Sequence, residues 1–85
     1  MTRTDVLVLE MLIVCNATAA VEAKTIKELL DIEDYAGIFS YSTLYRCLKN
    51  LTFVGLIGNG PKDHKAETYF IKEKGKSYYE SLVSN

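Results

Sequence analysis

The 85-residue chain contains no tryptophan, one proline, one histidine and two cysteines. The near absence of proline, together with an apolar fraction of 48%, favours one folded domain over a disordered chain. The cysteines, Cys15 and Cys47, lack CxxC spacing, and each is expected on the inward face of a helix. Two reduced core thiols in a cytoplasmic protein are therefore preferred to the alternatives, which are a disulfide or a metal-binding pair.

Motifs for catalysis and for metal binding are also missing. The sequence holds no GxGxxG, no Walker loop and no GxSxG. His64 has no group of carboxylates near it in sequence beyond Asp63. The acidic residues Asp31, Glu33 and Asp34 lack the ligand spacing and the turn glycine of a calcium loop. We therefore expect no enzymatic activity, no cofactor and no metal ion.

No apolar run in the chain is long enough to cross a bilayer. Residues 6–15 form an apolar stretch, but Glu10 interrupts it and it spans too few residues. No secretory signal is recognised either, so we expect no membrane partner.

Neither sign of charge is in large excess, because the formal net charge is −1. Residues 1–40 carry three basic and seven acidic side chains, whereas residues 41–85 carry seven basic and four acidic ones. The net charge of −1 by itself argues weakly against binding to nucleic acid. The uneven distribution nevertheless allows one face of the protein to be basic while the whole chain is slightly acidic.

An amphipathic helix is predicted over residues 41–53, with Ser40 as its N-terminal cap and Gly55 as the left-handed residue that ends it. Its inward face is apolar with i, i+3, i+4, i+7 spacing: Leu44, Cys47, Leu48 and Leu51. Its outward face carries side chains that donate to phosphates and base edges: Tyr41, Ser42, Tyr45, Arg46 and Lys49. These two faces are typical of a recognition helix that packs on a core and enters a DNA groove.

The other predicted elements follow from periodicity, caps and turn residues. The first helix is so apolar that it must be covered on more than one side, either within the monomer or in a dimer interface. Thr25 and Glu28 form a capping box that begins the second helix, which an acidic turn segment follows at 31–37. We further expect a first helix from Thr4 or Asp5 to about Asn16, strands at 21–24, 56–57 and 66–71, and a last helix at 73–83.

This order of elements predicts a mostly helical α+β fold over residues 1–85. The specific architecture is a winged helix-turn-helix with a three-helix core, a β-hairpin wing and a C-terminal helix. Residues 58–66 contain glycine, proline and basic side chains, and they form the tip of the wing.

Two segments resemble the signature of PadR-like winged-helix transcriptional regulators. Residues 43–51 read TLYRCLKNL and residues 55–57 read GLI, similar to T-[LI]-Y-R-x-L-x-x-L and G-L-I in that family. Residues 69–75 read YFIKEKG, similar to the end of Y-Y-x-[LI]-T-x-K-G, with Lys72 in place of threonine. The resemblance covers about residues 40–83 and implies a DNA-binding regulator. The centromere-binding adaptors of the TubR type, found on plasmids and phages, share the same architecture.

Three residues of the 41–53 helix are expected at base edges or at the adjacent DNA backbone, namely Ser42, Tyr45 and Arg46. Arg46 is the best placed for a bidentate contact to guanine, an assignment that depends mainly on the family resemblance. The alternative for Arg46 is a solvated side chain that bonds the acidic end of the second helix.

The remaining residues of this helix face have alternative roles. Lys49 is expected to hold a phosphate. Thr43 lies in the first turn, where backbone N–H groups point at phosphate, but it can also bond locally at the cap. Tyr41 and Tyr45 can instead pack as core aromatics, and Tyr45 can do both because its hydroxyl is a polar tip.

Basic residues outside this helix extend the predicted DNA-binding surface. Lys62, His64 and Lys65 mark the wing tip, which reaches the minor groove or the phosphate backbone, unless it is only a solvated turn. Lys24 and Lys27 lie near the start of the second helix, where the helix dipole favours phosphate.

The predicted function is therefore sequence-specific binding of double-stranded DNA by a homodimeric transcriptional regulator, most simply a repressor. Homodimerisation is inferred from the apolar first and last helices. One alternative is a centromere or partition adaptor that coats repeated DNA sites and recruits another protein. A second alternative is a protein-interaction module, which the sequence pI of 5.7 and the acidic N-terminal half favour.

Overall fold

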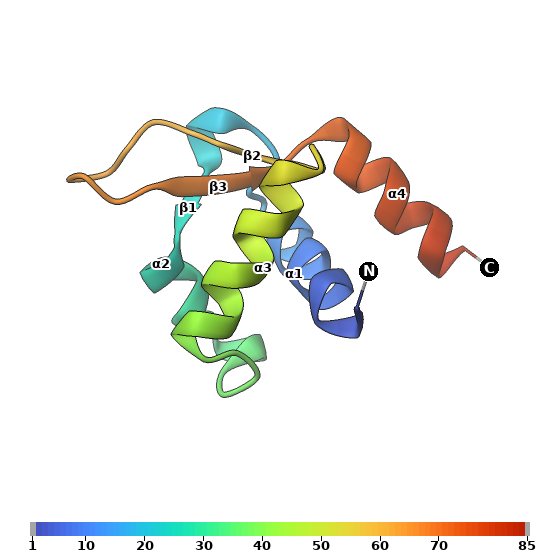
Figure 1. Cartoon of the computed structure of the whole chain (residues 1–85), viewed down its shortest axis with the longest axis horizontal. Helices are drawn as coiled ribbons and strands as arrows, with labels where there is room; N and C mark the ends of the chain where they lie inside the picture. The colour runs from blue at the N-terminus through green and yellow to red at the C-terminus, as the bar shows by residue number, and fades with distance from the viewer. Residues whose placement is uncertain (1, 85) are drawn as a thin grey trace.

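The computed structural model describes residues 2–84, which form four α-helices and a three-stranded antiparallel sheet (Figure 1). In chain order the elements are α1 (Arg3–Val14), η1 (Ala20–Glu22), β1 (Lys24–Thr25), α2 (Ile26–Leu30), η2 (Glu33–Tyr35), α3 (Tyr41–Phe53), β2 (Ile57–Asn59), β3 (Thr68–Ile71) and α4 (Glu73–Val83). The predicted fold class is confirmed, with α2 and α3 as the helix-turn-helix and β2–β3 as the wing hairpin.

Local signals in the sequence fix the bounds of α3, which are those predicted. Ser40 is the N-terminal cap, and its side chain accepts a hydrogen bond of 3.2 Å from the Thr43 N–H. Gly55 follows the helix with φ +85°, a conformation that glycine adopts without strain. The last helix, α4, also has its predicted bounds of Glu73–Val83.

The predicted bounds of the first helix are wrong at both ends. Thr2 caps α1, because its side chain accepts from the Asp5 N–H while Asp5 accepts from the Thr2 N–H. This capping box starts the helix at Arg3, before the predicted Thr4 or Asp5. The helix ends at Val14 because Asn16 takes a left-handed conformation with φ 62°.

The predicted strand at 21–24 is also wrong. Residues 20–22 form the 3-10 helix η1, and the strand that follows is β1, only two residues long. It pairs antiparallel with β3, with Lys24 opposite Tyr69 and Thr25 opposite Thr68, so the sheet order is β1-β3-β2. The expected two-stranded wing is thus continuous with a third strand that leads directly into α2.

The wing strands differ slightly from their predicted ranges. β2 continues to Asn59, and β3 begins at Thr68 rather than at residue 66. An isolated antiparallel bridge joins Asp63 to Ala66 farther out along the wing. Between them, His64 and Lys65 have φ 50° and 74°, so the chain reverses in a tight left-handed turn at the wing tip.

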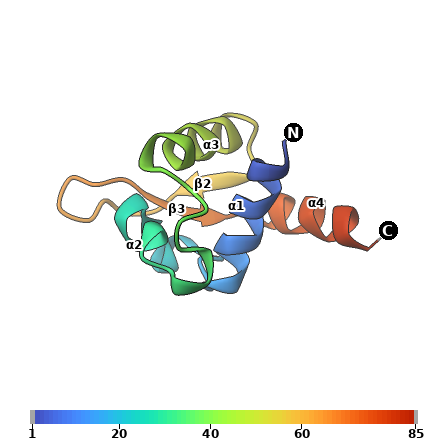
Figure 2. The ribbon, with the colours of Figure 1, turned by 90° about the horizontal axis from the view of Figure 1, so that it is seen from below.

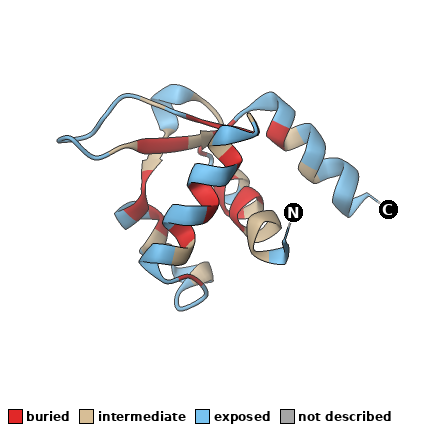
Figure 3. Cartoon of the chain, viewed as in Figure 1, coloured by how far each residue is buried: buried red, intermediate tan, exposed pale blue. Residues whose placement is uncertain are grey.

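The core lies between α1, α3 and the sheet. Four residues of α1 are completely buried within the protomer: Val8, Leu9, Met11 and Leu12. For these residues, the expectation that the apolar first helix is covered inside the monomer is confirmed. They meet the inward face of α3 and the strand residues Ile57, Tyr69 and Ile71 in one hydrophobic cluster. Figure 3 shows these buried positions on the facing sides of the elements.

α4 and the wing loop project from opposite ends of the molecule, as Figures 1 and 2 show. Gly75 is the one buried residue of α4. A Cβ atom at this position would lie 2.2 Å from the Leu56 carbonyl oxygen and 2.8 Å from Ile71 Cγ1. The absence of a side chain therefore lets the first turn of α4 lie against the start of the wing.

Candidate nucleic-acid interface

The outward face of α3 is open to solvent in the protomer. Of the six predicted contact residues on this helix, Thr43 is half-buried and the other five are exposed: Tyr41, Ser42, Tyr45, Arg46 and Lys49. On the opposite face, the four predicted core residues are all buried: Leu44, Cys47, Leu48 and Leu51. The back of α3 is thus anchored while its hydrogen-bond donors and cations stay accessible.

The two tyrosines of α3 contact each other rather than the core. Tyr41 and Tyr45 are 60% and 43% exposed. Their rings are nearly parallel, with an interplanar angle of 8° and centroids 6.4 Å apart. The alternative prediction, that these residues are core aromatics, is therefore wrong.

Lys49 is paired inside the protomer. Its Nζ lies 3.2 Å from Glu67 Oε2 on the wing and 5.4 Å from the centroid of the Tyr45 ring. The Glu67 carboxylate raises the pKa of Lys49, and Lys49 with the Tyr69 hydroxyl lowers the pKa of Glu67. Glu67 was not among the predicted site residues, because its acidic charge does not suggest a DNA contact and its partner is 18 residues away in sequence.

The Tyr69 hydroxyl is the second partner of Glu67. It donates a hydrogen bond of 3.2 Å to the same Oε2 atom. Burial raises the pKa of Tyr69 to about 12, so its hydroxyl remains protonated and able to donate. A core residue of β3 therefore holds the carboxylate that pairs with α3.

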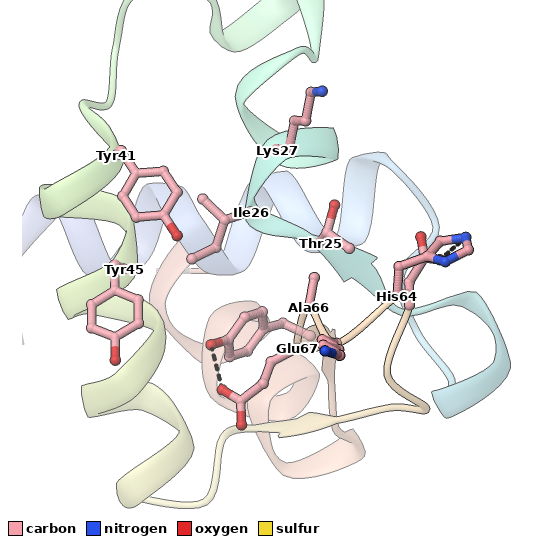
Figure 4. Close-up of a pocket in the computed structure, with 11 residues that line it drawn as sticks. Thr25, Ile26, Lys27, Tyr41, Tyr45, His64, Ala66 and Glu67 are labelled. Carbon is pink, nitrogen blue, oxygen red and sulfur yellow. Dashed lines mark hydrogen bonds and ion pairs between the residues drawn. The ribbon is translucent and has the colours of Figure 1, made fainter.

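A cleft of about 580 Å³ separates α3 from the wing. Figure 4 shows Tyr41 and Tyr45 on one side of it and His64, Ala66 and Glu67 on the other. The cleft brings together five of the predicted site residues: Lys27, Tyr41, Tyr45, His64 and Lys65. Loop and helix residues that are far apart in sequence thus line one surface.

Three predicted lysines do not line this cleft, namely Lys24, Lys62 and Lys49, the last of which pairs with Glu67 as described above. Lys62 is exposed on the wing loop. Lys24 is half-buried in β1, one residue before the Thr25 cap, so its predicted place at the start of the second helix is only approximate. Lys27 is exposed within α2, a helix of only five residues.

Arg46 lies on another side of α3, next to the start of α1. It lines a smaller cavity of about 280 Å³ with neighbours from both helices: Thr2, Thr4, Asp5, Thr43, Cys47 and Asn50. Within residues 2–84 it forms no hydrogen bond or salt bridge, so the predicted bond to the acidic end of α2 is wrong. The exposed Asn50 and the start of α1 are candidate contacts that the sequence reasoning missed, although Asn50 follows Arg46 at helical spacing.

Thr43 and the two cysteines have local or core contacts. Thr43 bonds locally, since its N–H donates to Ser40 Oγ and the Ser40 hydroxyl donates to Thr43 Oγ1 at 2.9 Å. Cys47 is buried and free, and burial raises the pKa of its thiol to about 11. Cys15 is a free thiol at the C-terminal cap of α1, half-buried and packed against the core cluster.

No family model matches this chain, and no curated protein matches it either. Among solved structures, TubR from Bacillus megaterium pBM400 is similar over 100% of this chain and 89% of its own, with a TM-score of 0.79 and 21% sequence identity. The fold is a winged helix-turn-helix. The narrower similarity to PadR-like regulators remains a resemblance, because no family model matches.

No helix within residues 2–84 has the length and apolar character needed to cross a membrane. Over the same residues, no three side chains of histidine, cysteine, aspartate or glutamate gather in a way that could hold a metal ion.

Proposed function

We propose that this protein binds double-stranded DNA with sequence specificity, as a homodimer, and acts as a transcriptional regulator, most simply a repressor. The observation that carries the proposal is the outward face of α3, which is exposed and rich in donors while its back is fixed to the core. A single helix of this kind fits the major groove of B-DNA.

The residues divide into base-reading and backbone-binding groups. Arg46 is exposed and unpaired among the described residues, so its guanidinium is free to form the two hydrogen bonds that guanine accepts. Ser42 and Tyr45 lie beside it on the helix for base edges or the adjacent backbone. The exposed basic side chains at α2 and the wing hold phosphates or reach the minor groove: Lys27, Lys62, His64 and Lys65.

Exposed apolar side chains support homodimerisation. α4 projects from the body, and Leu82 and Val83 in its last turn are 42% and 58% exposed (Figure 1). Such residues on a small protein favour an interface with a second copy. Two copies would place two recognition helices on successive turns of a palindromic site.

A centromere-type adaptor is the second candidate function, favoured by the similarity to TubR over the whole chain. This role uses the same helix and wing but needs an array of repeated DNA sites and a recruited protein partner.

Selection of genomic fragments by the purified protein, followed by footprinting, tests the proposal and separates the two roles. A single palindrome protected by the protein is the result expected for an operator, whereas clustered repeats indicate the adaptor role. No affinity for any duplex at low salt, combined with capture of a protein partner, would refute DNA binding and favour a protein-interaction module.

A further inference from the structure

Glu67 is an acidic residue in the middle of the surface proposed to meet DNA. It immediately precedes β3 and lines the cleft between the wing and α3. Within residues 2–84, its contact with Lys49 is the one salt bridge that a lysine or arginine forms. A negative charge at this place repels phosphate and also occupies a cation that phosphate would attract.

The two partners in this salt bridge differ in how firmly they are held. The Glu67 carboxylate accepts a hydrogen bond from the hydroxyl of Tyr69, a residue that is buried in the core. The exposed fractions of the two side chains are similar, 47% for Lys49 and 40% for Glu67, so exposure does not distinguish them. Their second contacts do, because Glu67 accepts a hydrogen bond from the buried Tyr69 whereas Lys49 has only the face of the exposed Tyr45 ring, 5.4 Å away. Lys49 is therefore the partner that can leave more easily.

We propose that Glu67 is a positioning residue that holds Lys49 against the wing. When DNA binds, the Lys49 ammonium group leaves the Glu67 carboxylate and pairs with a DNA phosphate instead. This inference rests on the proposed DNA-binding function. The exchange costs little because an ion pair between exposed side chains is weak. Glu67 thereby lowers the affinity for every DNA sequence, since phosphates carry no sequence information.

A cycle of four proteins tests the exchange: wild type, Lys49→Gln, Glu67→Gln and the double variant. Fluorescence anisotropy gives the affinity of each for the footprinted duplex and for a scrambled duplex, between about 50 and 200 mM salt. Glu80→Gln is the matched control, because it removes the same charge from an exposed position that does not line the cleft. Glu80 belongs to α4, which projects from the end of the molecule opposite the wing loop (Figure 1). Thermal melts verify that every variant is folded.

Three results are expected. Glu67→Gln tightens binding to both duplexes by about 1.5- to 5-fold, and Glu80→Gln does not. Lys49→Gln reduces the slope of log affinity against log salt by about 0.9, because one phosphate contact is lost. The gain from Glu67→Gln shrinks in the Lys49→Gln background, because the carboxylate then has no lysine to withhold.

Different results overturn different claims. The exchange alone is refuted if Lys49→Gln leaves the salt slope unchanged. It is also refuted if Glu67→Gln tightens binding no more than the control does, or tightens it equally in the Lys49→Gln background. The absence of binding by the wild type at low salt refutes the proposed function, and the role of Glu67 falls with it.

Discussion

Replacement of Gly75 by alanine tests how α4 is joined to the wing. The added Cβ would lie 2.2 Å from the Leu56 carbonyl oxygen, far inside the distance of ordinary contact. That oxygen belongs to the backbone and already accepts a hydrogen bond of 3.0 Å from the Lys72 N–H. Because neither the oxygen nor its donor is at the end of a flexible side chain, the helix itself must shift.

Two opposing terms set the size of the effect. Overpacking of this kind costs about 1–3 kcal/mol, and the rigid backbone contact favours the upper part of that range. Alanine regains at most about 1 kcal/mol of helix propensity over glycine. We therefore expect Gly75→Ala to lower the free energy of unfolding by about 2 kcal/mol, or the Tm by roughly 8–16 °C for a chain of this size.

Thermal and urea denaturation followed by circular dichroism measure this change. Ser77→Ala is the control, because Ser77 is exposed on the same helix and its replacement should change stability by no more than about 0.5 kcal/mol. A Gly75→Ala protein as stable as the control would show that α4 does not lie on the Leu56 carbonyl, and the reasoning would be wrong.

Other substitutions and a change of pH test separate parts of the structure. Arg46→Ala should weaken binding to the footprinted duplex by about 1–3 kcal/mol in gel-shift titrations without lowering the Tm; equal loss on scrambled DNA would contradict base reading. Thr25→Ala should cost about 1–2 kcal/mol in urea unfolding, because it removes the acceptor 3.1 Å from the Glu28 N–H, and an unchanged midpoint would argue against the cap. The free energy of unfolding should fall between pH 10 and 12. Burial raises the pKa of Tyr35 and of Tyr69 to about 12 in the folded protein, whereas the unfolded chain loses these protons near pH 10. A Tyr35→Phe variant should show a flatter decline.

The resemblance to the PadR-like signature acquires a physical explanation from the fold. Gly75, the glycine of the K-G segment, is required by the close approach of the Leu56 carbonyl. Gly55, in the G-L-I segment, takes a positive φ between α3 and β2. These constraints belong to the winged-helix architecture, so a similar pattern is expected wherever this helix joins this hairpin, whatever the function of the protein.

The bounds of α3 and α4 could be predicted because their signals are local. Ser40, Gly55 and a regular apolar spacing act within one or two helical turns, where the sequence can be interpreted directly. β1 could not be predicted, because a two-residue strand carries almost no pattern and exists only through its pairing with β3 more than forty residues later. The start of α1 was missed for a different reason, since the Thr2–Asp5 capping box was not recognised.

The candidate site was predictable only as a set of residues. Periodicity alone established which face of α3 carries Arg46, Lys49 and the two tyrosines, because a helix repeats every 3.6 residues. The tertiary structure decided that Lys49 of α3 meets Glu67 of the wing and that Arg46 lies beside the start of α1. Side-chain periodicity is a property of one helix, whereas the partner of a charge depends on how separate segments pack. If the four-protein cycle shows no coupling between Lys49 and Glu67, the packing of α3 against the wing would need revision, whereas the periodicity of α3 would stand.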